Sequence, residues 1–63
     1  MRLLARDETG TTVTLTREEV LIVNNALNEV ANGVHLDGEF VTRIGATRDE
    51  VLQLLAEIRR LRT

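Results

Sequence analysis

Two stretches of the 63-residue chain repeat apolar residues at helical spacing, and each begins with the same capping signal. Thr16-Arg17-Glu18-Glu19 and Thr47-Arg48-Asp49-Glu50 both match a capping box, in which a threonine hydroxyl and a glutamate carboxylate accept each other's backbone N–H. The apolar positions that follow recur every three or four residues. We therefore expect helices over about 17–32 and 48–62. The first should end at Asn32-Gly33, with the glycine in the left-handed conformation.

The segment before the first helix alternates polar and apolar residues, which is typical of a β-strand. Residues 11–15 are rich in β-branched side chains, and residues 2–5 can pair with them across the turn-rich connection 6–10. A hairpin on its own is only marginally stable in water. We therefore expect this N-terminal hairpin to pack on the two helices.

The connection between the helices, residues 34–46, carries two competing signals. Asp37-Gly38 between short apolar runs is typical of a type I′ hairpin turn. Phe40 and Ile44, in contrast, are spaced for one face of a short helical turn. We expect an irregular or short-stranded connection, and we expect Phe40, the only aromatic residue, to anchor the core.

Together these elements predict a small α+β fold, with residues 1–63 forming a single domain. In this fold the N-terminal β-hairpin packs on two α-helices. The expected core combines the apolar stripes of both helices with the inward positions of the hairpin and the connection. It consists of Val13, Leu15, Val20, Val23, Leu27, Val30, Phe40, Ile44, Val51, Leu54, Leu55 and Ile58.

The composition leaves little catalytic chemistry. The chain has no cysteine, no serine and one histidine, and its four glycines match no phosphate-binding motif. His35 stands near Asp37 and Glu39, but a metal site needs ligands that converge, and the intervening glycine turn separates these side chains. We expect a protein that is not an enzyme and has no cofactor, metal site or small-molecule substrate.

Charge and hydropathy restrict the partners and the location. Ten acidic and eight basic residues leave a net charge of −2, without the basic face that nucleic-acid binding favours. No apolar run approaches the ~18 residues that would span a membrane. We therefore expect a soluble cytoplasmic protein, for which nucleic acid and membranes are not the expected partners.

The stretch NNALNEVANG, residues 24–33, contains four asparagines within a predicted helix. The helical wheel places Asn24, Asn25 and Asn28 away from the apolar face. An amide both donates and accepts, so this stripe fits a solvated face, an anchor for the following loop, or an interface with another chain. Leucines left outside the core complete the candidate interface, which consists of Leu21, Asn24, Asn25, Asn28, Leu36 and Leu52.

These observations predict a non-catalytic protein–protein interaction module, either homodimeric or bound to a small bacterial protein. An immunity or antitoxin type of binding is one form of this function. The alternative is DNA binding, because a strand over 11–15, a helix from 17 and then GATRDEVLQLLAEI resemble the order in ribbon–helix–helix regulators. That resemblance implies that Thr12 and Thr14 face bases, and that Thr47 and Arg48 hold phosphate. The connection between the helices is longer than the short turn of that family.

A second resemblance covers residues 15–61. NNALNEVANG followed by EFVTRIGATRDEV resembles a recurring pattern in small bacterial proteins whose activity is not settled. The resemblance implies a bacterial, cytosolic origin.

Overall fold

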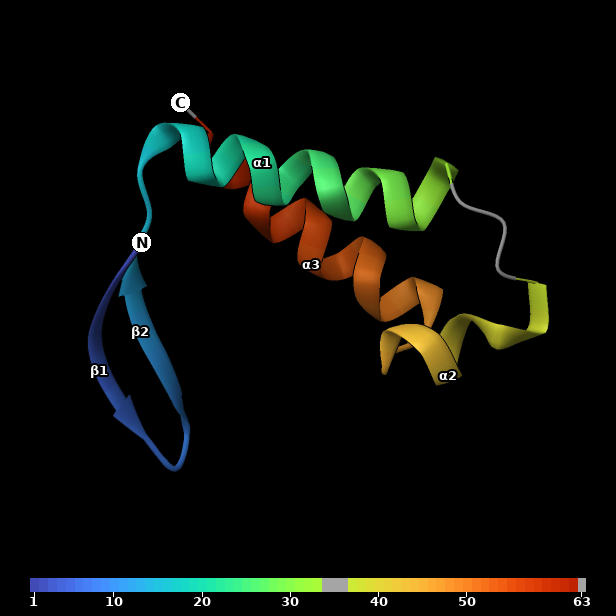
Figure 1. Ribbon diagram of the computed structural model, residues 1–63, viewed down its shortest axis with the longest axis horizontal. Coiled ribbons are helices and arrows are strands. Elements are labelled where there is room, and N and C mark those ends of the chain that lie inside the picture. Colours follow the sequence, from blue (N-terminus) through green and yellow to red (C-terminus); the bar gives the residue numbers. More distant parts are fainter. Residues whose placement is uncertain (34–36, 63) are drawn as a thin grey trace.

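A computed structural model describes residues 1–33 and 37–62 as a hairpin followed by helices (Figure 1). The antiparallel helices α1 and α3 lie side by side, and the hairpin extends away from them. The predicted α+β fold, with an N-terminal hairpin and two main helices, is confirmed. The elements in chain order are β1 (Arg2–Asp7), β2 (Gly10–Thr14), α1 (Arg17–Asn28), a π-helical turn η1 (Glu29–Gly33), a 3-10 turn η2 (Asp37–Glu39), α2 (Phe40–Ile44) and α3 (Arg48–Arg60).

Both capping boxes are present and set the first residues of α1 and α3. The Thr16 hydroxyl accepts the Glu19 N–H at 3.1 Å, and the Glu19 carboxylate accepts the Thr16 N–H at 2.9 Å. Thr47 and Glu50 repeat this pair at 3.1 and 2.9 Å. Each box satisfies two backbone donors that a helix start otherwise leaves free. The predicted helix starts are therefore confirmed.

The predicted mechanism for ending the first helix is wrong. The helix continues through the π-turn η1 to Gly33, and Gly45 is the glycine with a positive φ, at 84°, at the C-cap of α2. At Gly33 the Glu29 carboxylate lies so close that an added Cβ would be 2.7 Å from its Oε1. Gly33 therefore makes room for a side chain, while Gly45 supplies the left-handed turn between α2 and α3.

The connection between the long helices is helical where the structure describes it. η2 and α2 occupy residues 37–44, so the short-stranded reading is wrong, as is the type I′ turn at Asp37-Gly38. The helical spacing of Phe40 and Ile44 was the better signal, because Phe40 turns inward and is buried. Val34, His35 and Leu36 lie outside the described residues.

The predicted hairpin forms, with a longer first strand and a shorter connection than expected. Leu3 pairs with Val13, and a register shift between Leu3 and Ala5 leaves Leu4 as a bulge. At the turn, one Asp7 carboxylate oxygen accepts the N–H of Thr9 at 2.8 Å, the Thr9 hydroxyl at 2.7 Å and the N–H of Gly10 at 3.1 Å. This aspartate fixes the turn through its side chain.

The hairpin does not pack on the helices, so this part of the prediction is wrong. Every residue of β1 and β2 is exposed, and the strands project away from α1 and α3 (Figure 1). Leu15 and Thr16 connect β2 to α1, and the Thr16 backbone is extended, with φ −71° and ψ 167°. Contact with α1 is confined to the base of the hairpin.

The core lies between α1, α2 and α3 and is small. Ala31, Phe40 and Val51 form its central cluster, and Leu27, Val30 and Ala46 pack against them. Among the described residues the buried apolar side chains are Val20, Ala31, Phe40, Val51 and Leu55. Of the predicted core, Val20, Phe40, Val51 and Leu55 are therefore confirmed. Leu15, Val23, Leu27, Val30 and Ile58 are half-buried. Val13, Ile44 and Leu54 are exposed and were predicted wrongly.

Acid should weaken the fold through the carboxylates that hold the caps and the turn. Hydrogen bonds from the N-terminal ammonium and then from the Thr16 N–H lower the pKa of Glu19 below its ordinary 4.5. The Thr47 N–H and then its hydroxyl do the same for Glu50, and the Thr9 hydroxyl and then backbone N–H groups lower the pKa of Asp7 below 3.8. The folded state therefore binds these protons more weakly than the unfolded state does.

We expect this contribution to be complete above the ordinary pKa values and to be lost as the pH falls through the lower, folded ones. The urea midpoint should stay level from pH 7 to about pH 5 and then decline toward pH 3. Glu50→Gln should lower the midpoint at pH 7 and flatten the decline. A midpoint that is constant or rises between pH 5 and pH 3 would contradict this assignment.

Candidate protein-binding surface

The apolar face of the hairpin runs continuously onto α1. Leu3 and Val13 are cross-strand partners and so point to the same side of the sheet. Two residues farther along the same strands, Met1 and Leu15 follow on that side. These two residues line a groove of ≈260 Å³ together with Glu19, Ile22 and Val23. We call the continuous apolar surface of Met1, Leu3, Val13, Leu15, Ile22 and Val23 the inner face.

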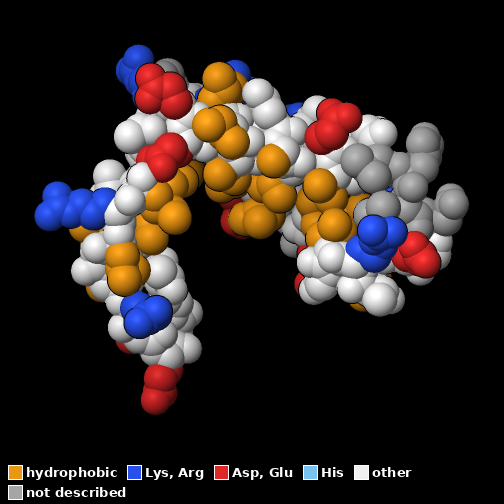
Figure 2. Space-filling model, viewed as in Figure 1, with side chains coloured by type: hydrophobic (Ala, Val, Ile, Leu, Met, Phe, Trp, Pro, Cys, Tyr) orange, Lys and Arg blue, Asp and Glu red, His pale blue; other side chains and the backbone are white. Residues whose placement is uncertain are grey.

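The inner face is open to solvent. Leu3 is 55% and Ile22 65% exposed. Figure 2 shows hydrophobic side chains along the border of the hollow between the hairpin and the helices. Single exposed apolar residues are ordinary, but contiguous patches of this kind mark sites where another surface docks.

The inner face is left open because α3 covers a different side of α1 from the one that the apolar pattern favours. The Arg59 guanidinium of α3 donates to the Asn28 side chain at 3.3 Å, and the Arg48 guanidinium donates to the Ala31 carbonyl. The buried line of α1 and η1 is Val20, Asn24 and Ala31. On a wheel of about 100° per residue this line lies roughly 60° from the centre of the apolar arc. Ile22 therefore lies opposite the side that α3 covers, and Val23 lies on the flank between the two sides.

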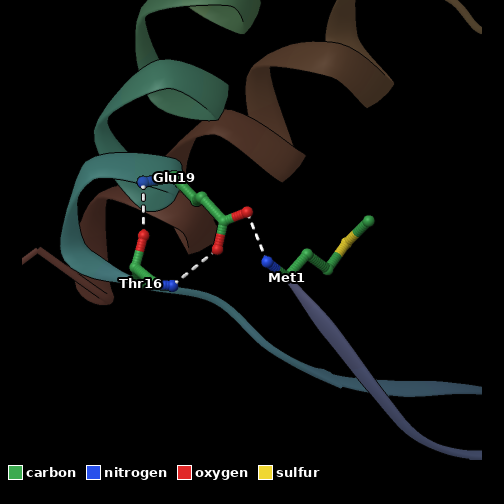
Figure 3. A network of polar contacts seen from close by, with 3 residues as sticks. All are labelled: Met1, Thr16 and Glu19. Carbon is green, nitrogen blue, oxygen red and sulfur yellow. Dashed lines mark hydrogen bonds and ion pairs between the residues drawn. The ribbon is translucent and has the colours of Figure 1, made fainter.

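The base of the hairpin is tied to α1 by the same glutamate that completes the capping box. Glu19 accepts the N-terminal ammonium of Met1 at 2.5 Å while its other oxygen accepts the Thr16 N–H (Figure 3). One carboxylate thus links the start of β1 to the start of α1. This link holds Met1 beside Ile22 at one end of the groove.

The asparagine stripe does not form one uniform surface. Asn24 is 4% exposed, so its predicted place on the outer face is wrong and it is closed to a partner. Asn28 is half-buried and accepts from both Arg59 and Asn32, at 3.3 and 3.0 Å. Asn25 is exposed and accepts from the Asn24 amide at 3.4 Å. Asn28 therefore joins α1 to α3, Asn24 is buried, and Asn25 faces solvent.

Asn24 carries an unsatisfied acceptor. Among residues 1–33 and 37–62, no donor lies within hydrogen-bond distance of its buried Oδ1. Leaving a buried acceptor without a donor costs about 1–3 kcal/mol. Asn24→Leu keeps a similar volume and removes this cost. We expect it to raise the free energy of unfolding by about 1–3 kcal/mol in urea denaturation.

Gln53→Leu is the control, because Gln53 is an exposed amide of α3 whose side chain makes no hydrogen bond to the described residues. It should leave the free energy of unfolding within about 0.5 kcal/mol of the wild type. A large loss of stability in Asn24→Leu would mean that the Asn24 amide makes a stabilising interaction in solution.

Leu21 lies on the opposite side of α1 from the inner face. It lines a second, shallow cleft of ≈520 Å³ between the start of α1 and the end of α3. That cleft is basic at its border, and its lining residues are Arg17, Val20, Leu21, Arg59, Leu61 and Arg62. Leu52 is exposed on α3, and Leu36 lies outside the described residues. The predicted interface residues therefore do not come together as one surface.

The inner face was not predicted from the sequence, although three of its residues had been assigned to the core. Val13 and Leu15 were assigned to the core because the hairpin was expected to pack on the helices, and Val23 because it lies on the apolar side of the first helix. The property that could have indicated this surface is the low stability of an isolated hairpin. Two strands alone are marginal in water, so strands with one apolar face need a covering surface. The sequence does not say whether that surface belongs to the same chain.

The residues implied by the ribbon–helix–helix resemblance are used within the chain or lie on the hairpin. Thr12 and Thr14 are exposed on β2, which pairs with β1 of the same chain. Thr47 caps α3. The Arg48 guanidinium donates to the Ala31 carbonyl, and its carbon lies 4.6 Å from the centroid of the Phe40 ring. Arg48 thus has a structural role between α3, η1 and α2.

In the part of the chain covered by residues 1–33 and 37–62, no three acidic or histidine side chains come together as metal ligands. Within the same ranges, no helix has the length and apolar character needed to cross a bilayer. The chain matches no protein family model, no curated protein and no solved structure.

Proposed function

We propose that the protein is a non-catalytic interaction module that binds another protein chain on its inner face. The observation that carries the proposal is the continuity of apolar side chains from the exposed Leu3 and Val13 of the hairpin to the exposed Ile22 and the half-buried Val23 of α1. A surface of this kind is stabilised when a second apolar surface removes it from water, at about 25 cal/mol per Å². An immunity- or antitoxin-type pairing is one form of this function.

The shape of the surface favours a protein over a small molecule. The inner face is spread along the hairpin and α1, which meet at an angle (Figure 1), and its groove at the base is open to solvent. Small-molecule sites are concave and bury most of the ligand. A protein segment can instead lie along both arms of the surface. The DNA-binding alternative has less support, because Arg48 is already engaged within the chain.

Affinity capture from cells that produce the chain tests this function. The tagged wild type and a tagged Leu3→Asp/Val13→Asp variant are compared, with bound proteins identified by mass spectrometry. We expect the wild type to retain a protein in stoichiometric amount, either untagged copies of itself or another chain, and the variant to lose it. No stoichiometric protein, or equal retention by the variant, would overturn the proposal.

A further inference from the structure

The folded chain is thinner and more extended than a self-sufficient domain of its length. It spans 36 × 29 × 15 Å, with a radius of gyration of 13.1 Å. A compact domain of 63 residues has a radius of gyration of about 11 Å. The extra extension comes from the projecting hairpin (Figure 1). Stable domains are built from at least two packed layers, and the hairpin has no second layer within the described residues.

The solvent-accessible surface area of the chain is also larger than that of a self-sufficient domain of its mass. The chain exposes 5253 Å². A folded monomer of 7.1 kDa exposes about 4,100 Å². The excess is therefore about 1,150 Å² per chain. Since a standard stable interface buries about 800 Å² on each partner, one copy has the surplus surface that a stable dimer requires.

We propose that a second copy of this chain covers the inner face, with the hairpin of each copy lying along α1 of the other. This inference rests on the proposed function and names the partner. Leu3 and Val13 of one copy then meet Ile22 and Val23 of the other, and the exchange is reciprocal. A closed two-fold pair of this kind covers both apolar surfaces at once.

The charges of Arg6 and Glu29, and their distances from the apolar residues of the inner face, are compatible with this exchange. Arg6 pairs with Thr11, which is two residues before Val13, so Arg6 lies on the same side of the hairpin as Val13. Glu29, the first residue of η1, follows Ile22 by seven residues and so lies on the same side of the helix. Leu3 and Arg6 are about 10 Å apart along a strand. Ile22 and Glu29 are about 10 Å apart along a helix. An apolar contact at the base can therefore be followed by an Arg6–Glu29 ion pair between copies.

Disulfide trapping between singly substituted chains tests the arrangement, because the native chain has no cysteine. A tagged Leu3→Cys chain is mixed with an untagged Ile22→Cys chain, unfolded, refolded and oxidised. The matched control uses Leu21→Cys in place of Ile22→Cys, since Leu21 is also exposed but lies on the other side of α1. Circular dichroism verifies that each variant folds.

We expect the Leu3–Ile22 pair to give a disulfide-linked heterodimer on a non-reducing gel, at least tenfold above the Leu3–Leu21 pair. Equal yields in both mixtures, or no heterodimer, would overturn the exchange. If the chain does not associate with itself but captures another protein in a Leu3- and Val13-dependent way, the second copy is wrong and the proposed function stands. If neither association occurs, both are wrong.

Discussion

Replacing Phe40 by alanine is expected to unfold most of the helical part of the protein. Phe40 is buried against Ala31 and Val51, and it joins α2 to the ends of η1 and α3. Phe→Ala substitutions at such sites cost about 3–5 kcal/mol. A chain of this size rarely has more than about 3–5 kcal/mol of stability from its own core. The variant also removes the ring beneath the Arg48 guanidinium.

Circular dichroism at 222 nm during urea and thermal denaturation measures this effect. The control is Val41→Ala, which truncates the next residue of α2, exposed to 55%. That variant should shift the free energy of unfolding by less than about 0.5 kcal/mol. If Phe40→Ala melted within error of Val41→Ala, Phe40 would belong to a surface, and the core assigned to residues 31, 40 and 51 would be wrong.

Replacing Ile22 by aspartate should abolish stable self-association. Ile22 is the most exposed large apolar residue of α1 and stands at the groove where the hairpin meets the helix. In the proposed pair it is covered by Leu3 and Val13 of the second copy, so the substitution would bury a carboxylate against apolar side chains. Central interface residues contribute about 2 kcal/mol or more, which corresponds to a roughly 30-fold or greater rise in Kd.

Leu21→Asp is the matched control for this variant. It places the same charge on the adjacent residue, which is 42% exposed and lies in the cleft bordered by arginines. Analytical ultracentrifugation over a concentration series should show a Kd within about threefold of the wild type for Leu21→Asp. An equal loss of association in both variants would mean that the interface is not confined to the inner face.

Local signals in the sequence predicted the elements well. The two capping boxes gave the first residues of α1 and α3, because cap chemistry involves only four neighbouring residues. The alternation of residues 11–15 gave the second strand for the same reason. The spacing of Phe40 and Ile44 also indicated the short helix α2, although the competing Asp37-Gly38 turn signal left the connection undecided.

The arrangement of these elements was harder to predict, because it depends on which sides of them meet. The apolar arc of α1 is broader than one neighbouring helix can cover. α3 lies on the side with Val20 and Ala31, which buries Asn24 and leaves Ile22 outside. The wheel alone favoured the centre of the arc and so placed Asn24 in solvent. The contacts of Arg59 and Arg48 with α1 and η1 set this side, and both are long-range.

The position of the hairpin was hard to predict for the same reason, because it depends on which surfaces meet. Its apolar face was recognised, and a covering surface was expected. We expected the surface that covers the hairpin to belong to the same chain. In the structure the strands leave the helix pair, so Val13 is exposed and Leu15 lies at the rim of a groove. The candidate surface therefore follows from the path of the chain at Thr16 rather than from the residue types alone.

The mass of the purified chain in solution tests the central claim most directly. Light scattering coupled to size-exclusion chromatography, or sedimentation equilibrium, over about 1–500 µM gives this mass without any substitution. Reciprocal pairing on the inner face predicts about 14 kDa at the upper concentrations, twice the 7.1 kDa of one chain. A mass of 7.1 kDa across the whole range would contradict it.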